Sequence, residues 1–288
     1  MAGWAFNDAN IILYIEVALM FALLNMNAVE ENFTSSNHSF IVSHSIAPLW
    51  SGLSDSTLHL MERFFWWIHI AGILAFLNYL PFSKHFHIIL AFPNTYYANL
   101  EAKGRFANNA TVTKEVKLMM DPSADPFAAP APDGPIEKFG AKDAMDLSWV
   151  NLLNAYTCTE CGRCTSECPA NLTGKKLSPR KIMMDTRDRI DEIGKNIEAN
   201  GEFKDDGKTL LGDYISQEEL WACTSCNACV QACPVDIDPL NIIMQLRNFA
   251  TMEESSAPAE LNAMMTNVEN NGAPWPFSQM DRANWINE

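Results

Sequence analysis

The chain contains no histidine between residues 88 and 288 and no cysteine outside residues 158–233. Mixed Cys/His zinc fingers are therefore excluded from its C-terminal part. A dinucleotide fingerprint, a phosphate-binding loop and a zinc-protease pattern are all absent, so nothing resembles a known catalytic apparatus. Basic residues are scarce, with 12 Lys plus Arg against 21 Asp plus Glu from Ser148 onward. This balance argues against binding to nucleic acid, which requires a basic face.

The eight cysteines form two runs with the same spacing, C-x2-C-x2-C-x3-C, each followed by proline. This spacing is typical of proteins that bind 4Fe–4S clusters, and in two-cluster proteins the fourth cysteine of each run ligates the other cluster. We therefore predict two 4Fe–4S clusters. The predicted ligands of the first are Cys158, Cys161, Cys164 and Cys233, and those of the second are Cys223, Cys226, Cys229 and Cys168.

Two other interpretations of these cysteines fit less well. A zinc site takes about four ligands, commonly from paired C-x2-C units and often with histidine. Each run here instead holds four cysteines and a following proline. A disulfide framework is typical of small, cysteine-dense secreted domains, whereas cluster ligands must stay reduced. Electron transfer is therefore the function that the cysteines indicate.

Residues 1–92 are rich in Leu, Ile, Phe and Trp, unlike the polar and acidic remainder. Two runs in this part, Ile11–Asn25 with its flanks and Phe64–Phe82, reach the roughly 20 residues that a membrane span requires. A signal peptide is a poor fit for the first run, because no basic residue precedes it and no small-residue cleavage site follows. We predict two transmembrane helices. The alternative is a pair of buried core helices.

Lysine and arginine are distributed unevenly around these two runs. The connecting loop, residues 28–61, contains none, whereas the next such residues after the second run are Lys84, Lys103, Arg105, Lys114 and Lys117. The positive-inside rule places the side rich in Lys and Arg in the cytoplasm. We therefore predict a multi-pass protein of the inner (cytoplasmic) membrane, in contact with membrane lipid, with the cysteine runs in the cytoplasm.

Two histidines, His69 and His87, lie in and just after the second apolar run. On one continuous helix they would share a face and lie roughly 27 Å apart, too far to ligate a single haem. A polar residue within a span is a functional candidate, and histidine is a common axial haem ligand. We predict His69 and His87 as ligands of two different b haems. The alternative is that both are satisfied or interfacial polar side chains.

The sequence divides into four parts: a membrane domain (residues 1–92), a surface segment with a Pro- and Ala-rich linker (93–147), a two-cluster domain (148–250) and a covering or docking tail (251–288). The two-cluster domain repeats a second motif, P-x-x-I-x-M-x-x-R, from Pro179 and again from Pro239. Proline is favoured at a helix start, and the apolar residues have helical spacing. We predict an all-α fold, with two transmembrane helices followed by a cytoplasmic α-helical dicluster ferredoxin domain.

The membrane part resembles the last helix of the haem b-binding gamma subunit of respiratory nitrate reductase. The resemblance is carried by His69 and the sequence PFSKHFHI from Pro81 to Ile88. It implies that the two histidines each bind a different b haem. That family supplies the opposite ligands from an earlier helix, which this chain does not contain. Other membrane helices, from a partner or from a longer membrane domain, would then supply the missing ligands or a quinone site; otherwise no haem is bound.

Residues 148–250 resemble the small iron–sulfur subunit of heterodisulfide reductase and the cluster domains of anaerobic glycerol-3-phosphate dehydrogenase. The resemblance is carried by CTECGRCTSECP, the following SPRKI and WACTSCNACVQACP. Together with the membrane part, it is similar to membrane-bound heterodisulfide reductase-related proteins. There the two-cluster module passes electrons between a membrane haem or quinone site and a cysteine-rich catalytic subunit. The resemblance implies such a cysteine-rich, or a flavin-containing, catalytic partner.

These observations predict a non-catalytic electron-transfer subunit of a membrane-bound oxidoreductase, with a heterodisulfide reductase-like or other redox partner in the cytoplasm. Two further hypotheses remain open. One is a membrane anchor or assembly scaffold whose clusters are structural, since metal binding can supply folding energy outright. The other is a complete enzyme that oxidises quinol at the membrane face and reduces a soluble acceptor.

Overall fold

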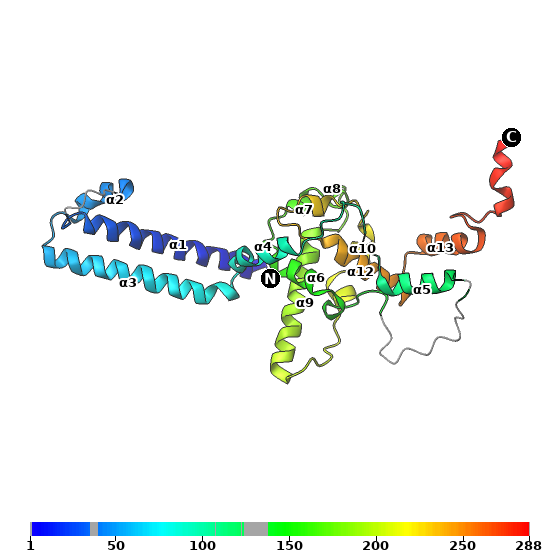
Figure 1. Cartoon of the computed structure of the whole chain (residues 1–288), viewed down its shortest axis with the longest axis horizontal. Coiled ribbons are helices and arrows are strands. Elements are labelled where there is room, and N and C mark those ends of the chain that lie inside the picture. The colour runs from blue at the N-terminus through cyan, green and yellow to red at the C-terminus, as the bar shows by residue number, and fades with distance from the viewer. Residues whose placement is uncertain (1, 35–39, 107, 122, 124–137, 288) are drawn as a thin grey trace. The chain divides into compact units, whose positions relative to one another are not determined.

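The computed structural model describes residues 2–34, 40–106, 108–121, 123 and 138–287 (Figure 1). Within these ranges the regular structure is helical, without strands apart from one isolated bridge between Leu211 and Ile215. The predicted all-α class is confirmed, with two long apolar helices in the N-terminal half and the cysteine-bearing domain after them. The chain forms two compact units, residues 1–89 and 90–288. The four-part division stays a prediction.

The first unit is a pair of long helices, α1 (Ala2–Glu30) and α3 (Asp55–Tyr79), that lie side by side (Figure 1). The short helices α2 (Ile41–Ile46) and η1 (Ala47–Trp50) lie in the connection between them. Ala22, Val29, Leu58 and Phe65 form the buried contact between the long helices and the connection. Gly72 permits close approach, because a Cβ there would lie 2.6 Å from Cδ2 of Leu19.

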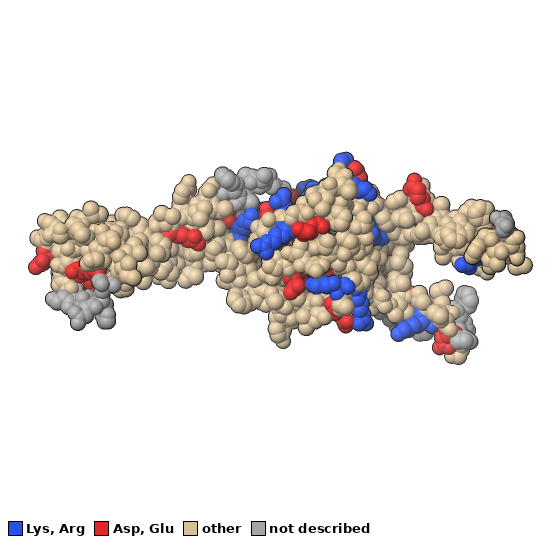
Figure 2. All heavy atoms as spheres, turned by 90° about the horizontal axis from the view of Figure 1, so that it is seen from above, with Lys and Arg blue, Asp and Glu red and all other residues tan. Residues whose placement is uncertain are grey.

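Most of the apolar surface of this pair faces outward. Two helical stretches, Asn7–Glu30 and Asp55–Phe82, are long and apolar enough to cross a membrane, and only 17% and 6% of their apolar windows are buried. The structure therefore does not show the alternative, a pair of core helices buried within this chain. Figure 2 shows few charged side chains along this pair on the face in view, whereas they gather on the cysteine-bearing domain.

Helix α3 ends at Tyr79, before the second histidine. After Tyr79 come η2 (Leu80–Phe82), an extended Ser83, η3 (Lys84–Phe86) and then α4 (His87–Tyr96). His69 and His87 therefore do not lie on one continuous helix, so the shared face and spacing expected for such a helix do not apply. The break has a local cause: Pro81 has no N–H to continue the helix.

A buried carboxylate fixes the backbone at this break. Asp8 accepts a hydrogen bond from the Tyr79 hydroxyl, and its Oδ2 accepts from Ser83 Oγ at 3.2 Å and from the Lys84 N–H at 2.8 Å. Residues from the start of α1 and the end of α3 are thereby joined. The extended conformation of Ser83 is stabilised at the point where the predicted helix would have continued.

The second unit is built around α9 (Pro179–Asn200) and α12 (Pro239–Met252), the two helices whose first residues form the repeated motif. Against them pack α6 (Trp149–Thr157), α7 (Arg163–Ser166), α8 (Pro169–Leu172), η5 (Leu210–Tyr214), α10 (Gln217–Ala222) and α11 (Ala228–Gln231). Their core includes fully buried Ile182, Leu220, Ile242 and Leu246. The remaining helices are α5 (Ala110–Met120), η4 (Ala144–Asp146), α13 (Ala259–Asn271) and η6 (Gln279–Ile286).

Residues 138–147, assigned from sequence to the linker, belong to this core. Ala141, Ala144 and Leu147 are buried, and the Ala141 N–H donates to the Gln245 carbonyl at 3.1 Å. Gly140 lies directly on α12, where a Cβ would meet the Phe249 backbone nitrogen at 2.3 Å. Most of the predicted linker, residues 122 and 124–137, lies outside the described residues.

Candidate iron–sulfur centres

Both cysteine runs have the same backbone design. Each begins where a helix ends, α6 before Cys158 and α10 before Cys223, and the second run follows the first with a constant offset of 65 residues. Positive φ values recur at equivalent positions, 60° at Glu160 and 56° at Ser225. A residue with positive φ beside residues with negative φ turns successive backbone N–H groups toward one side. This forms the anion-binding concavities common at Fe–S sites. The first loop is defined here as residues 158–164 and the second loop as residues 223–229.

The fourth cysteine of the first run lies with the second loop. Cys168, Cys223, Cys226 and Cys229 line one cavity. Its other walls are apolar, including Leu177, Leu240 and Ile243. The four predicted ligands of the second cluster are therefore brought together by the fold.

The fourth cysteine of the second run lies with the first loop. The pKa of Cys158 is raised to about 11, chiefly by burial and with smaller effects of the Cys164 and Cys233 thiols. Burial also raises the pKa of Cys164, to which Cys233 and Cys161 add. Cys158 and Cys164 are therefore close enough to Cys233 to interact with it, and Cys164 also acts on Cys229 of the second group. The individual ligand assignments stay predictions.

The buried thiols require a positive partner to ionise. Burial raises the pKa of Cys229 to about 12, with the Cys223 thiol adding to the effect. Bound iron deprotonates a coordinating thiol outright, and backbone N–H groups are already aimed at two of these sulfurs. Ser225 donates to Cys223 Sγ and Ile237 donates to Cys233 Sγ, each at 3.4 Å. The donor set and its hydrogen bonds thus fit anionic clusters.

Single-ion geometry is not what these residues form. In the described part of the chain, no three His, Cys, Asp or Glu side chains are arranged to hold one metal ion. In a cubane cluster each thiolate binds a different iron, so the four sulfurs surround a volume rather than converge on a point. Four cysteines that line one cavity fit the arrangement of a cubane cluster.

Two arginines that sequence reasoning left without a role brace the loops. Arg187 and Arg247 close the two copies of the repeated motif. Arg187 Nη2 donates to Glu160 Oε1 at 2.7 Å, and Arg247 Nη2 donates to the Cys223 carbonyl at 2.6 Å. The repeat was the signal that could have indicated them.

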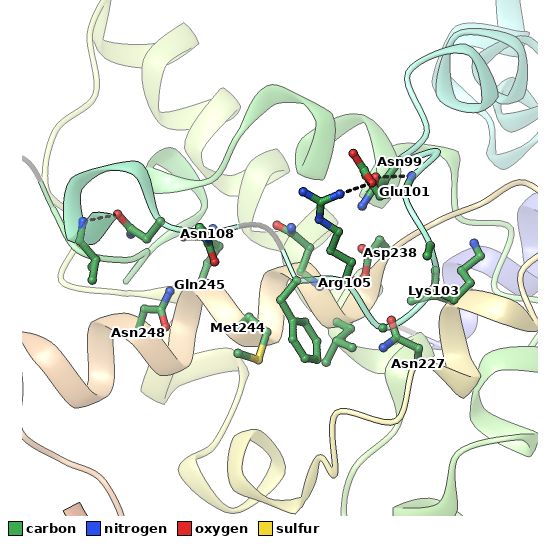
Figure 3. A pocket seen from close by; sticks show the side chains of 18 of the residues that line it. Asn99, Glu101, Lys103, Arg105, Asn108, Asn227, Asp238, Met244, Gln245 and Asn248 are labelled. Atoms are coloured by element: carbon green, nitrogen blue, oxygen red, sulfur yellow. Dashed lines mark hydrogen bonds and ion pairs between the residues drawn. The ribbon is translucent and has the colours of Figure 1, made fainter. Parts of the chain in front are cut away.

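A cavity of about 300 Å³ lies beside the second loop (Figure 3) and was not foreseen from the sequence. Residues between 99 and 113 line one wall and α12 the other, with Asn227 and Val230 at the loop itself. Its lining is rich in amide side chains, labelled in the figure as Asn99, Asn108, Asn227, Gln245 and Asn248. Among the charged residues in the wall, Arg105 pairs with Glu101 at 2.6 Å and Lys103 with Asp236 at 3.3 Å, and Asp238 caps α12.

The two predicted haem ligands each hydrogen-bond through Nδ1. His69 Nδ1 lies 3.0 Å from the Leu19 carbonyl, and His87 Nδ1 lies 2.7 Å from the Lys84 carbonyl. A carbonyl only accepts, so Nδ1 carries the proton in each ring and Nε2 keeps its lone pair. This is the arrangement in which a carbonyl orients a metal-binding histidine, and it also satisfies a polar side chain that binds nothing. Haem binding stays a prediction.

Comparison with known proteins supports the iron–sulfur interpretation. Residues 157–237, which include all eight cysteines, match the 4Fe-4S dicluster domain. The chain is 29% identical to the probable iron-sulfur-binding oxidoreductase FadF of Bacillus subtilis, over 86% of this chain and 36% of that protein. It is 28% identical to the EtfAB:quinone oxidoreductase of Syntrophomonas wolfei, over 84% of this chain and 34% of that protein. The chain spans about a third of the length of these curated relatives.

Two shorter matches are informative. A probable membrane-anchored ferredoxin of Chromohalobacter salexigens is 29% identical over 51% of this chain and 24% of its own length. One subunit of the ferredoxin/F420H2-dependent CoB-CoM heterodisulfide reductase of Methanosarcina acetivorans is 34% identical over 41% of this chain and 60% of its own length. The chain is therefore an iron–sulfur electron-transfer protein related to oxidoreductases. More particularly, it is distantly homologous to FadF-like proteins, membrane-anchored ferredoxin and this heterodisulfide reductase subunit, so that part of the predicted resemblance is confirmed.

Proposed function

We propose that this chain is the electron-transfer subunit of a membrane-bound oxidoreductase. It would conduct electrons between a quinone or haem site in the inner membrane and a cytoplasmic redox partner of the heterodisulfide reductase type. The observation that carries this proposal is that Cys168, from the first run, lines one cavity with Cys223, Cys226 and Cys229 of the second loop, which supports the predicted exchange of fourth cysteines. Because each loop completes the other's site, two clusters would be held close together on one rigid core.

The membrane side of the proposal rests on α1 and α3. Their apolar residues face outward, as lipid-facing residues do, and two relatives bear names that include a quinone and a membrane anchor. We propose that these helices span the inner membrane and that the cluster domain lies in the cytoplasm. His69 and His87 would each offer Nε2 to a b haem whose second ligand comes from other membrane helices.

The cytoplasmic side rests on the exposure of each loop. Cys161 and Cys226, the second cysteine of each run, are exposed, whereas Cys168 and Cys229 are buried. The exposed edges are where a catalytic partner, rich in cysteine or containing flavin, would exchange electrons. The domain carries an excess of Asp and Glu from Ser148 onward, so a basic surface on the partner fits it.

The test uses the complex isolated from membranes. A quinol analogue is added anaerobically, and the reduction of the clusters is followed by EPR, with a pyridine haemochrome assay on the same sample. The proposal predicts quinol-dependent changes in the redox state of the clusters that depend on the membrane partner. Clusters that neither quinol nor a low-potential donor reduces would instead indicate a structural role in an anchor or scaffold. Quinol-dependent reduction in the isolated chain alone would indicate a complete enzyme.

A further inference from the structure

The two motif arginines occupy equivalent positions but meet different partners. Arg187 pairs with a carboxylate on the first loop, Glu160, and both side chains are largely buried, at 13% and 10% exposed. The equivalent position of the second loop holds Ser225, whose Oγ accepts from Arg247 Nη1 at 3.2 Å. The third position of the loops therefore differs by one negative charge, and the sixth differs by one positive charge, Arg163 in the first loop against Ala228 in the second.

The hydrogen bonds of Arg247 in the described part of the chain are all made to neutral groups. Its guanidinium donates to the carbonyls of Leu220 at 2.8 Å and Cys223 at 2.6 Å, and it lies 4.9 Å from the centre of the Trp221 ring. Among the described residues no carboxylate lies within salt-bridge distance of this guanidinium. Its charge is therefore not neutralised locally, although it contacts the backbone of a predicted cluster ligand.

Other charges act near both loops and must be kept constant in any comparison. Asp238, which caps α12 by accepting from the Asn241 N–H at 2.9 Å, acts on Cys229. Asp188 lies close enough to Arg187 and Glu160 to interact with both. The natural difference in potential between the clusters is the sum of all these charges. Exchanging the residues at the third position of each loop, Glu160 and Ser225, isolates the contribution of that position to the reduction potentials.

We propose that Arg247 is a positioning residue that raises the reduction potential of the cluster on the second loop, and that Glu160 cancels the same effect of Arg187 on the first. The inference rests on the proposed function, since it requires two bound clusters. Its physical basis is that reduction adds negative charge to a cluster, so a nearby uncompensated cation favours the reduced form. Net charge and hydrogen bonds around the sulfurs are known levers on cluster potential, and the low interior dielectric strengthens them.

The experiment is an EPR-monitored redox titration of the intact chain in detergent, with the two signals assigned by Cys161→Ser and Cys226→Ser. Ser225→Glu should lower the potential of the second-loop cluster and leave the first-loop cluster unchanged. Glu160→Ser should raise the potential of the first-loop cluster. Ser225→Gln, which has the same size as Glu and no charge, is the matched control and should leave both potentials near those of the wild type.

A second pair of variants keeps the test decisive if an exchange disturbs folding. Arg247→Lys retains the charge and should keep the potential, whereas Arg247→Gln should lower it. Iron and acid-labile sulfide are counted for each variant. Full clusters with unchanged potentials in both Ser225→Glu and Arg247→Gln would overturn the inference. Absence of clusters from the wild-type chain would instead overturn the proposed function.

Discussion

Arg189 donates paired hydrogen bonds to both carboxylate oxygens of Asp143, from Nε to Oδ1 at 2.9 Å and from Nη2 to Oδ2 at 2.7 Å. The same guanidinium reaches Asp206 Oδ2 at 2.6 Å and the Lys208 carbonyl at 2.8 Å. The Arg189 side chain is fully buried, and hydrogen bonds to Asp143 and Asp206 raise the pKa of its guanidinium. This network joins the segment before α6 and the loop after α9 to the centre of the cluster domain.

Replacing Arg189 with Met should destabilise the chain by about 1.5–3 kcal/mol, because the buried guanidinium loses its charge-assisted hydrogen bonds to the half-buried Asp143. The measurement is denaturant unfolding of the intact chain in detergent. Lys208→Gln is the control, since it breaks an ion pair with Glu192 at 2.8 Å in which both side chains are substantially exposed. Such a pair contributes only about 0–1 kcal/mol. Equal losses in the two variants would contradict the proposed role of the network.

Gly140 and Gly194 provide a matched pair of glycine substitutions. A Cβ at Gly140 would lie 2.3 Å from the Phe249 backbone nitrogen, whereas one at Gly194 would meet nothing within 4 Å. Gly140→Ala should therefore cost about 1–3 kcal/mol through backbone displacement. Gly194→Ala, inside α9, should instead stabilise the chain by up to about 1 kcal/mol. Unfolding midpoints of the two variants test this, and a neutral Gly140→Ala would show that residue 140 is not packed on α12.

Cys168 should be a ligand of the second-loop cluster, although it follows the first loop in the sequence. We expect Cys168→Ser to alter the EPR signal that Cys226→Ser also alters. The signal that responds to Cys161→Ser should stay unchanged, because the first loop draws its fourth ligand from Cys233. If Cys168→Ser instead changes the same signal as Cys161→Ser, each run ligates its own cluster and the exchange of fourth cysteines is wrong.

Each membrane histidine should hold a separate haem in the native complex. His69→Ala and His87→Ala are each expected to remove about half of the haem b measured by the pyridine haemochrome assay, since each side chain offers one axial ligand. His44→Ala is the control, because that side chain is exposed and pairs with Glu31 at 3.2 Å in the described part of the chain. An unchanged haem content in both variants would assign the two histidines a structural role.

The sequence was most informative where function depends on local spacing. The spacing of the cysteine runs was enough to predict cluster ligands, because a C-x2-C-x2-C loop needs only neighbouring backbone to form. The length of the apolar runs predicted α1 and α3. The helix break before His87 was harder to foresee. Pro81 was visible, but the capture of Lys84 N–H by Asp8, 76 residues away, depends on the tertiary fold.

The electrostatic partners were beyond local reasoning for the same reason. Asp143 and Arg189 are 46 residues apart, and Glu160 and Arg187 are 27 apart, with no periodic pattern between them. Residues 138–147 had the composition of a linker because small residues such as Gly140 and Ala141 are also what close packing against a helix requires. Composition alone does not distinguish the two cases.

The content of iron and acid-labile sulfide in the anaerobically purified chain, measured together with its EPR spectrum, tests the central claim most directly. Two clusters held by eight cysteines predict about eight irons and eight sulfides per chain, with cubane signals on reduction. A preparation that binds about two zinc ions, one for every four cysteines, and contains no labile sulfide would contradict it.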